Sequence, residues 1–373
     1  MQSITIAPIF PPTTSFTDNR TYLHTLADGD KVFYALNSIG IEFIAPRNTL
    51  STSIIGGGCR FDLCAVFNHN IGTTYIPDVP AYLAYLENHA ALLGFEPQKI
   101  SGMGTAAAMK NAVIGTAVLN DLVIECIITA GTDSNAGRVG DSVIADSADS
   151  SMPAGTINII LNINAALPPG TLARTLVTCT EAKTAALQEL MIGSCFSDGL
   201  ATGTGTDQVI LITNPASPIT VSDVGKHSST GELIGRMVIA AVKTALYSET
   251  GMNAAKQHSV LRRLQRFGTT ENRLYLAYCS IARTPITPTD FARLYKSLDN
   301  SPEFVTLTSL FVHLIDQYRY GLISFDAVIN TANSLALTST QRCDNSPIVI
   351  QGNNTEELIS AWERLLAWCA VNN

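Results

Sequence analysis

Residues 202–207 alternate hydroxyl side chains with glycines and end on a carboxylate. They read Thr202, Gly203, Thr204, Gly205, Thr206 and Asp207. Glycines at every second position let backbone N–H groups approach an anion or oxyanion closely. A threonine hydroxyl is a candidate nucleophile or donor, and Asp207 is a candidate base. The simpler interpretation is a turn that requires glycine conformations. The segment is not a P-loop, because it lacks Gly-Lys-Ser/Thr and leads into a predicted strand.

A second polar segment, residues 225–235, follows eighteen residues after Asp207 and reads Gly-Lys-His-Ser-Ser-Thr-Gly-Glu-Leu-Ile-Gly. Histidine is the side chain most often used for proton transfer at physiological pH, so His227 is the natural acid to protonate a leaving amine. Ser229 and Glu232 have the spacing of a capping box at a helix start. Glu232 therefore either caps that helix or serves as a base. The other five histidines lie in segments without an accompanying motif.

Further polar residues follow or occupy predicted strands. Asn135, Arg138 and Asp141 lie in a glycine-rich loop after a predicted strand, and loops at strand ends commonly bind ligands. In a functional interpretation, Asn135 and Arg138 hydrogen-bond an amide carbonyl or an oxyanion. In the alternative, Arg138 and Asp141 pair with each other. Asn158 lies on an apolar strand, where it is either a structural clip or a substrate contact, because a buried Asn needs partners.

Two further features invite both a structural and a functional interpretation. Glu181 and Lys183 lie two residues apart on a predicted helix, so they point to different faces and only one easily faces a cleft. Glu181 is a candidate general base, and a solvated helical pair is the alternative. Residues 56–58 are three consecutive glycines, which indicate a turn or the close approach of a bulky ligand.

Together these segments resemble the adenosylcobinamide amidohydrolase family, the enzymes of corrinoid salvage. The resemblance covers roughly residues 45–250 and does not extend to residues 255–373. The matching segments, which occur in the family's order, are Gly102–Met109 (GMGTAAAM), Thr129–Ala136 (TAGTDSNA), Arg138–Asp141 (RVGD), Pro153–Ile160 (PAGTINII), Thr178–Leu187 (TCTEAKTAAL) and the two segments described first.

The resemblance implies hydrolysis of the amide that joins the aminopropanol arm to the corrin ring of adenosylcobinamide. That reaction needs a nucleophile, oxyanion stabilisation and a proton for the amine. From residue chemistry, the hypothesis is that Asp207 or Glu232 acts as base for water or for a threonine such as Thr204, and His227 as general acid. Backbone N–H groups of residues 203–205, with Asn135 or Arg138, would form the oxyanion site. The further expected substrate-binding residues are Asp141, Thr156, Asn158, Glu181, Thr202 and Thr206.

The corrinoid is the substrate in this hypothesis, and the sequence predicts no cofactor and no metal site. Two alternatives stay open. One is a corrinoid-binding protein without catalysis. The other is a self-processing threonine hydrolase in which Thr156 or Thr204 is freed by cleavage after a glycine.

The order of predicted elements positions these motifs. Strands and helices alternate up to about residue 253, which predicts an α/β or α+β fold with a central mixed sheet flanked by helices. The predicted strands are Ile41–Ala45, Thr52–Ile55, Ile100–Met103, Leu122–Ala130, Gly155–Ile163 and Gln208–Thr213. The predicted helices are Asp78–Gly94, Thr105–Leu119, Leu172–Leu190 and Leu233–Tyr247.

The chain is predicted to have three parts. Residues 1–40 comprise an N-terminal arm, expected to be poorly ordered or extended over residues 1–20, and the first elements. Residues 41–253 form the catalytic domain, and residues 254–373 form a helical region of unknown role. The helices predicted in that region are Lys256–Phe267, Asp290–Leu298, Glu303–Tyr318, Ser324–Ala336 and Glu356–Cys369.

Composition excludes several classes of protein. The 373 residues are 46% hydrophobic and 14% charged with a net charge of −8, so the basic footprint of a nucleic-acid binder is missing. No window approaches the roughly 18 consecutive apolar residues of a membrane helix. The N-terminus lacks signal-peptide features, which predicts a cytoplasmic protein. Eight scattered cysteines predict reduced and mostly buried thiols. A homo-oligomer is compatible with the sequence.

Overall fold

The computed structural model describes most of the chain and divides it into two compact units. The described residues are 2–11, 20–72, 74, 76–142, 155–340 and 348–372. The first unit comprises Met1–Phe196 with Leu200–Asn253, and the second comprises Ser197–Gly199 with Ala254–Asn373. Cys343 and most of residues 1–20 beyond the first strand lie outside the described residues, as do Pro153 and Ala154.

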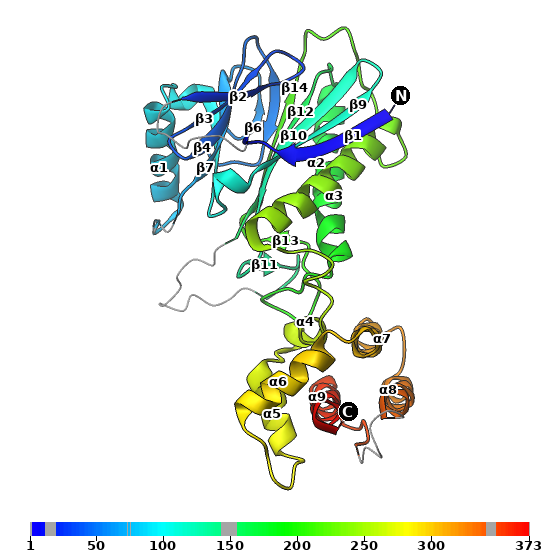
Figure 1. The fold of residues 1–373 in the computed structure, drawn as a ribbon. Coiled ribbons are helices and arrows are strands. Elements are labelled where there is room, and N and C mark those ends of the chain that lie inside the picture. Colours follow the sequence, from blue (N-terminus) through cyan, green and yellow to red (C-terminus); the bar gives the residue numbers. More distant parts are fainter. Residues whose placement is uncertain are drawn as a thin grey trace. The chain divides into compact units, whose positions relative to one another are not determined.

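The first unit is built on a seven-stranded mixed sheet (Figure 1). Its central strands, β10, β12 and β14, are continuous apolar runs, as expected for strands that are buried on both faces. Within the sheet only β12 and β14 pair in parallel, and the other neighbours are antiparallel. In sheet order the strands are β1 (Gln2–Pro8), β9 (Val113–Leu119), β10 (Leu122–Ala130), β12 (Ile157–Ile163), β14 (Gln208–Thr213), β5 (Asn48–Ser51) and β6 (Gly58–Arg60).

A second sheet of five strands lies against the first. Its β7 and β8 are parallel, and its other pairs are antiparallel. In order the strands are β2 (Thr21–Thr25), β3 (Lys31–Ala35), β4 (Ser38–Glu42), β7 (Ala65–Asn70) and β8 (Ile100–Thr105).

Side-chain alternation stacks these elements in four layers. On β12, Ile159 packs in the core formed with α2 (Pro169–Glu189) and α3 (Ser229–Thr250), whereas Ile160 packs against the smaller sheet. The far face of the smaller sheet packs on α1 (Val79–Leu92). Figure 1 shows α1 outside the smaller sheet and α2 and α3 against the large one. The predicted mixed sheet with flanking helices is confirmed, and a second sheet is inserted between the large sheet and α1.

The helix predicted over Thr105–Leu119 is wrong. A short 3₁₀ turn, Met109–Asn111, leads instead into strand β9. Residues 113 and 117 share a face in a strand as well as in a helix, because a spacing of four fits both periods. Buried and half-buried residues alternate along the first part of β9, as in a strand with one face in the core. Gly115 lies on the buried face, where a Cβ would be 2.9 Å from Cys126 Sγ of the neighbouring strand.

Other predicted boundaries also shift. Of the two conformations predicted for the N-terminal arm, residues 2–8 adopt the extended one, as the edge strand β1. Thr52–Ile55 lies beyond the end of β5, and Ile41–Ala45 overlaps only the end of β4. The first two of the three glycines serve backbone packing, because a Cβ on Gly56 would lie 2.2 Å from the carbonyl oxygen of Ile100 and one on Gly57 1.9 Å from that of Ser53. This close approach of backbone to backbone needs no ligand.

The described part of the second unit is helical, as predicted, with α5 as an additional element. Its core contains Trp362 stacked on Phe311 with ring centroids 4.4 Å apart. In the same unit, Arg266 forms a bidentate ion pair with Asp316, and its side chain is 5% exposed. The helices are α4 (Val260–Leu264), α5 (Glu271–Cys279), α6 (Pro288–Asp299), α7 (Pro302–Arg319), α8 (Phe325–Thr340) and α9 (Thr355–Asn372). Besides Met109–Asn111, the described residues contain the 3₁₀ turns Pro97–Lys99 and Gln265–Phe267.

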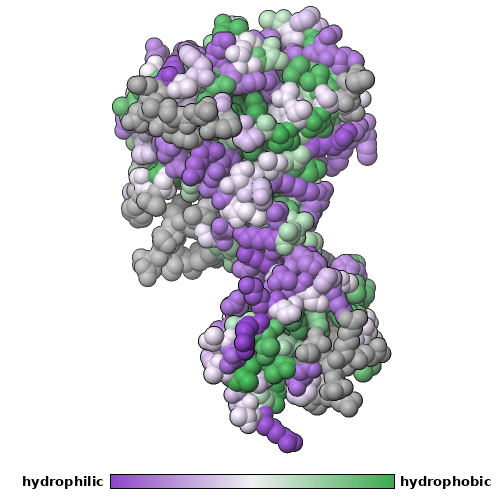
Figure 2. All heavy atoms as spheres, in the orientation of Figure 1, coloured by the Kyte–Doolittle hydropathy of each residue, from purple (hydrophilic) through white to green (hydrophobic). Residues whose placement is uncertain are grey.

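The surface and the cysteines complete the description of the fold. On the face drawn in Figure 2, hydrophilic and hydrophobic residues are interspersed over the first unit. None of the helices in the described residues has the length and apolarity needed to cross a membrane. Of the seven described cysteines, Cys59, Cys64 and Cys195 are exposed and three are buried, so the prediction of mostly buried thiols is wrong.

Two histidines are buried between the smaller sheet and α1. The imidazoles of His69 and His89 stack with centroids 3.6 Å apart, and Ser38 Oγ lies 2.9 Å from His69 Nδ1 and 2.7 Å from His89 Nε2. Burial and the neighbouring His89 lower the pKa of His69 to about 3, and burial lowers the pKa of His89 to about 4. Both rings are therefore neutral in the folded chain at neutral pH.

The first unit should lose stability as the pH falls below about 6.5. In that range the unfolded chain binds protons on both histidines while the folded chain does not, until the pH approaches 4. Between pH 7.5 and pH 5 we expect a loss of about 2–4 kcal/mol in the free energy of unfolding. Urea denaturation followed by β-sheet circular dichroism measures it. The double variant His69→Gln, His89→Gln should lose most of this pH dependence, and exposed His227→Gln should keep it. An unchanged pH dependence in the double variant would show that these two rings are not its source.

Candidate active site

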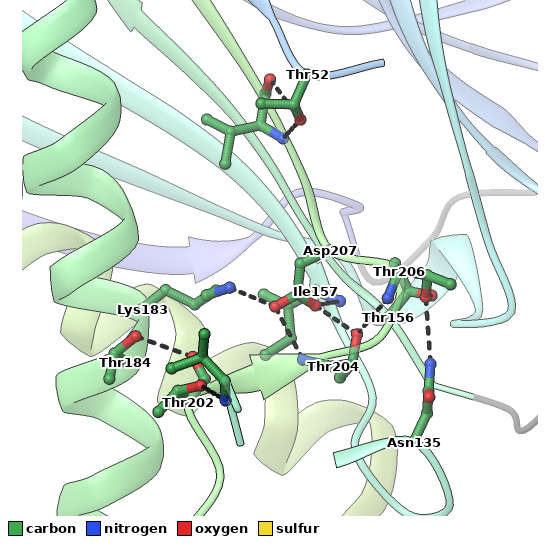
Figure 3. Close-up of polar contacts among 12 residues, drawn as sticks. Thr52, Asn135, Thr156, Ile157, Lys183, Thr184, Thr202, Thr204, Thr206 and Asp207 are labelled. Carbon is green, nitrogen blue, oxygen red and sulfur yellow. Dashed lines mark hydrogen bonds and ion pairs between the residues drawn. The ribbon is translucent and has the colours of Figure 1, made fainter. Parts of the chain in front are cut away.

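The N-terminal ends of two parallel neighbouring strands bring the main polar motifs together. Asn158 of β12 pairs in register with Gln208 of β14, so the residues just before these strands, Thr156 and Asp207, end on the same edge of the sheet. A two-stranded ribbon, β11 (Ala136–Gly137) with β13 (Gly203–Thr204), joins the loop after β10 to the glycine-threonine segment. Helix α2 adds Lys183 (Figure 3).

The carboxylate of Asp207 organises this edge. Its Oδ1 accepts hydrogen bonds from Ile157 N–H at 2.9 Å and from Thr204 Oγ1 at 2.5 Å. Its Oδ2 accepts from Thr204 N–H at 2.9 Å and forms an ion pair with Lys183 Nζ. A carboxylate offers about four acceptor sites, and all four are used. The Asp207 and Lys183 side chains are each 9% exposed, so Asp207 cannot accept a substrate proton without giving up one of these bonds.

This ion pair explains the first glycine of the segment. A Cβ on Gly203 would lie 2.3 Å from Asp207 Oδ2 and 2.7 Å from Lys183 Nζ. A Cβ on Gly205 would meet the Asn135 carboxamide less tightly, with its nearest atom, Oδ1, at 3.2 Å. The space beside Gly203 is therefore filled by the chain's own ion pair rather than left for an oxyanion. The N–H of Thr204 is likewise already used by Asp207.

A hydroxyl and carboxamide network lies next to the ion pair. Thr156 Oγ1 and Thr206 Oγ1 are 2.6 Å apart, and Asn135 Nδ2 donates to Thr206 Oγ1 at 3.3 Å. Asn135 Nδ2 also donates to the carbonyl oxygen of Gly155 at 2.8 Å. Asn135 and Thr156 are each 5% exposed. Figure 3 shows Asn135, Thr156 and Thr206 on one side of Asp207 and Lys183 on the other.

The remaining residues of the glycine-rich loop support the ribbon. Thr202 Oγ1 accepts from Val139 N–H at 2.9 Å. Asp141 Oδ2 accepts from the backbone N–H of Arg138 at 2.7 Å and from Ser194 Oγ at 2.6 Å. The Arg138 guanidinium donates to the carbonyl oxygen of Leu200 at 3.4 Å. Arg138 and Asp141 thus meet, as one interpretation of the sequence predicted, but through the backbone of Arg138.

Three predicted site residues lie outside this cluster. His227 is exposed beside Lys226, which pairs with Glu181. Glu232 is also exposed and pairs with Arg236 one turn later on α3. The predicted capping box is wrong, because Ser228 rather than Ser229 caps α3 by accepting from Gly231 N–H at 3.0 Å. Neither His227 nor Glu232 contacts Asp207.

Comparison with known proteins matches the part of the chain that carries this cluster. The model of the adenosylcobinamide amidohydrolase family matches residues 23–254. The chain belongs to this family. An uncharacterized protein of Methanocaldococcus jannaschii is 32% identical over 223 residues, which are 56% of this chain and 85% of that protein. The resemblance seen in the motifs is confirmed, and most of the second unit lies beyond the family match.

In this member of the amidohydrolase family, Asn158 is more deeply buried than the polar cluster around Asp207. It is fully buried between the two sheets, and its Nδ2 donates to Asn68 Oδ1 at 2.8 Å and to the carbonyl oxygen of Gly104 at 3.0 Å. Its Oδ1 has no hydrogen-bond partner among the described residues. These contacts fit the structural-clip interpretation, because they join β12 to β7 and β8.

Lys183 is the site residue that sequence reasoning passed over. The two-residue spacing of Glu181 and Lys183 correctly predicted opposite faces, but chemical preference for a base favoured Glu181. The structure turns Lys183 inward and leaves Glu181 exposed. The apolar residues around Lys183 could have indicated that it points inward. The buried side of α2 includes Cys179, Ala182, Ala186 and Leu187, and Lys183 lies among them in the sequence.

The Gly203→Ala variant should destabilise the site, whereas Gly170→Ala should not. The added methyl group at Gly203 displaces a hydrogen-bonded ion pair, and we expect a loss of about 1–3 kcal/mol in unfolding free energy. Gly170, near the start of α2, has no atom within 4 Å of an added Cβ, so its variant should be neutral or slightly stabilising. Calorimetry of both variants tests this. Equal stability of the two would contradict the tight packing around Gly203.

Proposed function

We propose that this chain hydrolyses the amide between the aminopropanol arm and the corrin ring of adenosylcobinamide. The products are adenosylcobyric acid and aminopropanol, which makes the reaction a step in the salvage of cobalamin precursors. Family membership over residues 23–254 carries this proposal. The buried cluster of hydroxyls, a carboxamide and an ion pair supports it, since all its members come from the matched part of the chain.

The cluster suggests different roles from those that residue chemistry alone predicted. The proposed nucleophile is the Thr156 hydroxyl, which has Thr206 Oγ1 2.6 Å away as a proton partner. The proposed oxyanion donor is the Asn135 carboxamide, because an uncharged amide N–H directed at a developing oxyanion stabilises the transition state. Both side chains are held by neighbours that are themselves hydrogen-bonded.

Asp207 becomes a positioning residue in this proposal. It holds Lys183, Thr204 and the first N–H of β12 with a saturated carboxylate, and Lys183 balances the charge of Asp207 on the side away from Asn135, Thr156 and Thr206. We assign no proton transfer to His227, Glu232 or Glu181, because each is exposed and lies outside the cluster. Thr202, Gly205 and Arg138 remain candidates for contact with the corrinoid at the edge of the ribbon.

The Asn135→Ala variant should lose about 10²–10³-fold in kcat/KM, the loss typical of a missing oxyanion donor. Chromatographic detection of adenosylcobyric acid measures the rate. The matched control is Asn164→Ala at the opposite end of β12, where Asn164 supports the backbone of Asp121 and Val123. We expect that control to remain within about threefold of wild type.

Two outcomes would contradict the proposal. Wild-type turnover by Asn135→Ala would remove Asn135 from the chemistry. Tight binding of adenosylcobinamide by the pure wild-type chain without any product would instead favour a corrinoid-binding protein.

A further inference from the structure

The peptide bond between Gly155 and Thr156 has the surroundings of a reactive bond rather than of an ordinary strand entry. The carbonyl oxygen of Gly155 accepts from Asn135 Nδ2 at 2.8 Å and from Thr206 Oγ1 at 3.4 Å. Two side-chain donors therefore converge on one carbonyl oxygen, as they do where a tetrahedral oxyanion must be stabilised.

The hydroxyl that would attack this carbonyl is the one on Thr156 itself. A hydroxyl has one hydrogen to donate and can accept twice. Thr206 donates to the carbonyl oxygen of Gly155 and accepts from Asn135, so in the 2.6 Å contact it accepts the hydrogen of Thr156. The Thr156 oxygen thus has its proton directed to a neighbour and its lone pairs free.

The backbone holds this bond in place from both sides. Gly155 has φ +133°, a conformation that side chains rarely adopt, and a Cβ there would lie 2.9 Å from the carbonyl oxygen of Gly131. The carbonyl oxygen of Thr156 accepts from Gly131 N–H at 3.1 Å, and Ile157 N–H donates to Asp207. The N–H of Thr156 makes no hydrogen bond with the described residues.

We propose that the chain cleaves its own Gly155–Thr156 bond, and that the freed Thr156 is the nucleophile of the amidohydrolase. The second part rests on the proposed function. Thr156 Oγ attacks the carbonyl carbon of Gly155, and its proton passes to Thr206 Oγ1. Thr206 then turns its own hydrogen from the Gly155 oxygen to the leaving nitrogen of Thr156, while Asn135 Nδ2 remains the oxyanion donor. The C–N bond breaks and leaves an ester between Gly155 and Thr156 Oγ. Water hydrolyses that ester to the Gly155 carboxylate and the Thr156 hydroxyl.

Cleavage would convert the same groups into a substrate site. The new α-amino group of Thr156 becomes a base next to its own hydroxyl, which is the way an N-terminal threonine is activated. Asn135 Nδ2 and Thr206 Oγ1 lose the carbonyl oxygen of Gly155 as a partner and become available to a substrate oxyanion. The fragments stay together, because β12 of one is paired with β10 of the other in the large sheet.

The surroundings distinguish Thr156 from Thr204, the other threonine that follows a glycine. Both the N–H and the hydroxyl of Thr204 donate to Asp207. Its hydroxyl is thereby directed to a saturated carboxylate, and Gly203 is fixed in the ribbon opposite Gly137. Among the described residues, no side-chain donor contacts the carbonyl oxygen of Gly203, so the reactive arrangement occurs at Thr156.

Intact mass spectrometry of the purified chain under denaturing conditions tests the cleavage. We expect fragments of 155 and 218 residues in place of the 373-residue chain, with the longer fragment beginning Thr-Ile-Asn-Ile-Ile. Thr156→Val should stay whole, and Thr156→Ser should be cleaved. The matched control is Thr213→Val, a buried threonine at the other end of β14, which should be cleaved like wild type.

A wild-type chain that stays whole would overturn the proposal, as would cleavage of Thr156→Val at the same bond, which would indicate an external protease. If Thr156→Val fails to fold, Asn135→Ala replaces it as the test variant, because it keeps the Thr156 hydroxyl and loses the donor to the Gly155 carbonyl oxygen. Cleavage of Asn135→Ala should be at least tenfold slower than that of wild type. Cleavage at the wild-type rate would overturn the proposal. An intact chain that hydrolyses adenosylcobinamide refutes the cleavage and keeps the proposed function. A cleaved chain that leaves adenosylcobinamide unchanged supports the cleavage and refutes the proposed function.

Discussion

The fold of the site depends on one saturated carboxylate. Asp207 receives four hydrogen bonds from three separate segments, namely the start of β12, the glycine-threonine loop and helix α2. Burying a lysine and an aspartate costs several kcal/mol per ion, and good geometry with further hydrogen bonds is needed to offset that cost. The two backbone N–H groups and the Thr204 hydroxyl provide those bonds.

Several features of the chain follow from this interaction. Position 203 is a glycine because the ion pair occupies the space of a side chain. The N-terminal end of β12 is fixed relative to β14, which places the Thr156 hydroxyl against Thr206 and the carbonyl oxygen of Gly155 against Asn135. Asn158, two residues after Thr156 on β12, hydrogen-bonds the second sheet. The Thr156 hydroxyl, the proposed nucleophile, therefore lies directly before a strand that is held at its start, on both edges and across the two packed sheets.

The sequence predicted the parts that local patterns determine. Apolar runs gave β10, β12 and β14, and the glycine-threonine motif singled out Asp207 and its neighbours. The prediction was wrong where a pattern fits both the helical and the strand period. In residues 113–117, apolar residues spaced by four suit a strand as well as the predicted helix. The sequence also did not show that His227 and Glu232 lie outside the cluster, because proximity to a motif along the chain does not reveal which side chains point toward it. Lys183 became visible only when the packing of α2 on the sheet was known.

A double-mutant cycle between Lys183 and Asp207 tests the central claim, that one buried carboxylate–ammonium pair organises the site. Native-state hydrogen exchange of the β12 amides in Lys183→Met, Asp207→Asn and the double variant measures the stability of the first unit. Each single change should cost about 3–5 kcal/mol, because it leaves one charge buried without its partner. The double variant should cost less than the two losses together by about 1–3 kcal/mol. Losses that simply add would contradict the account.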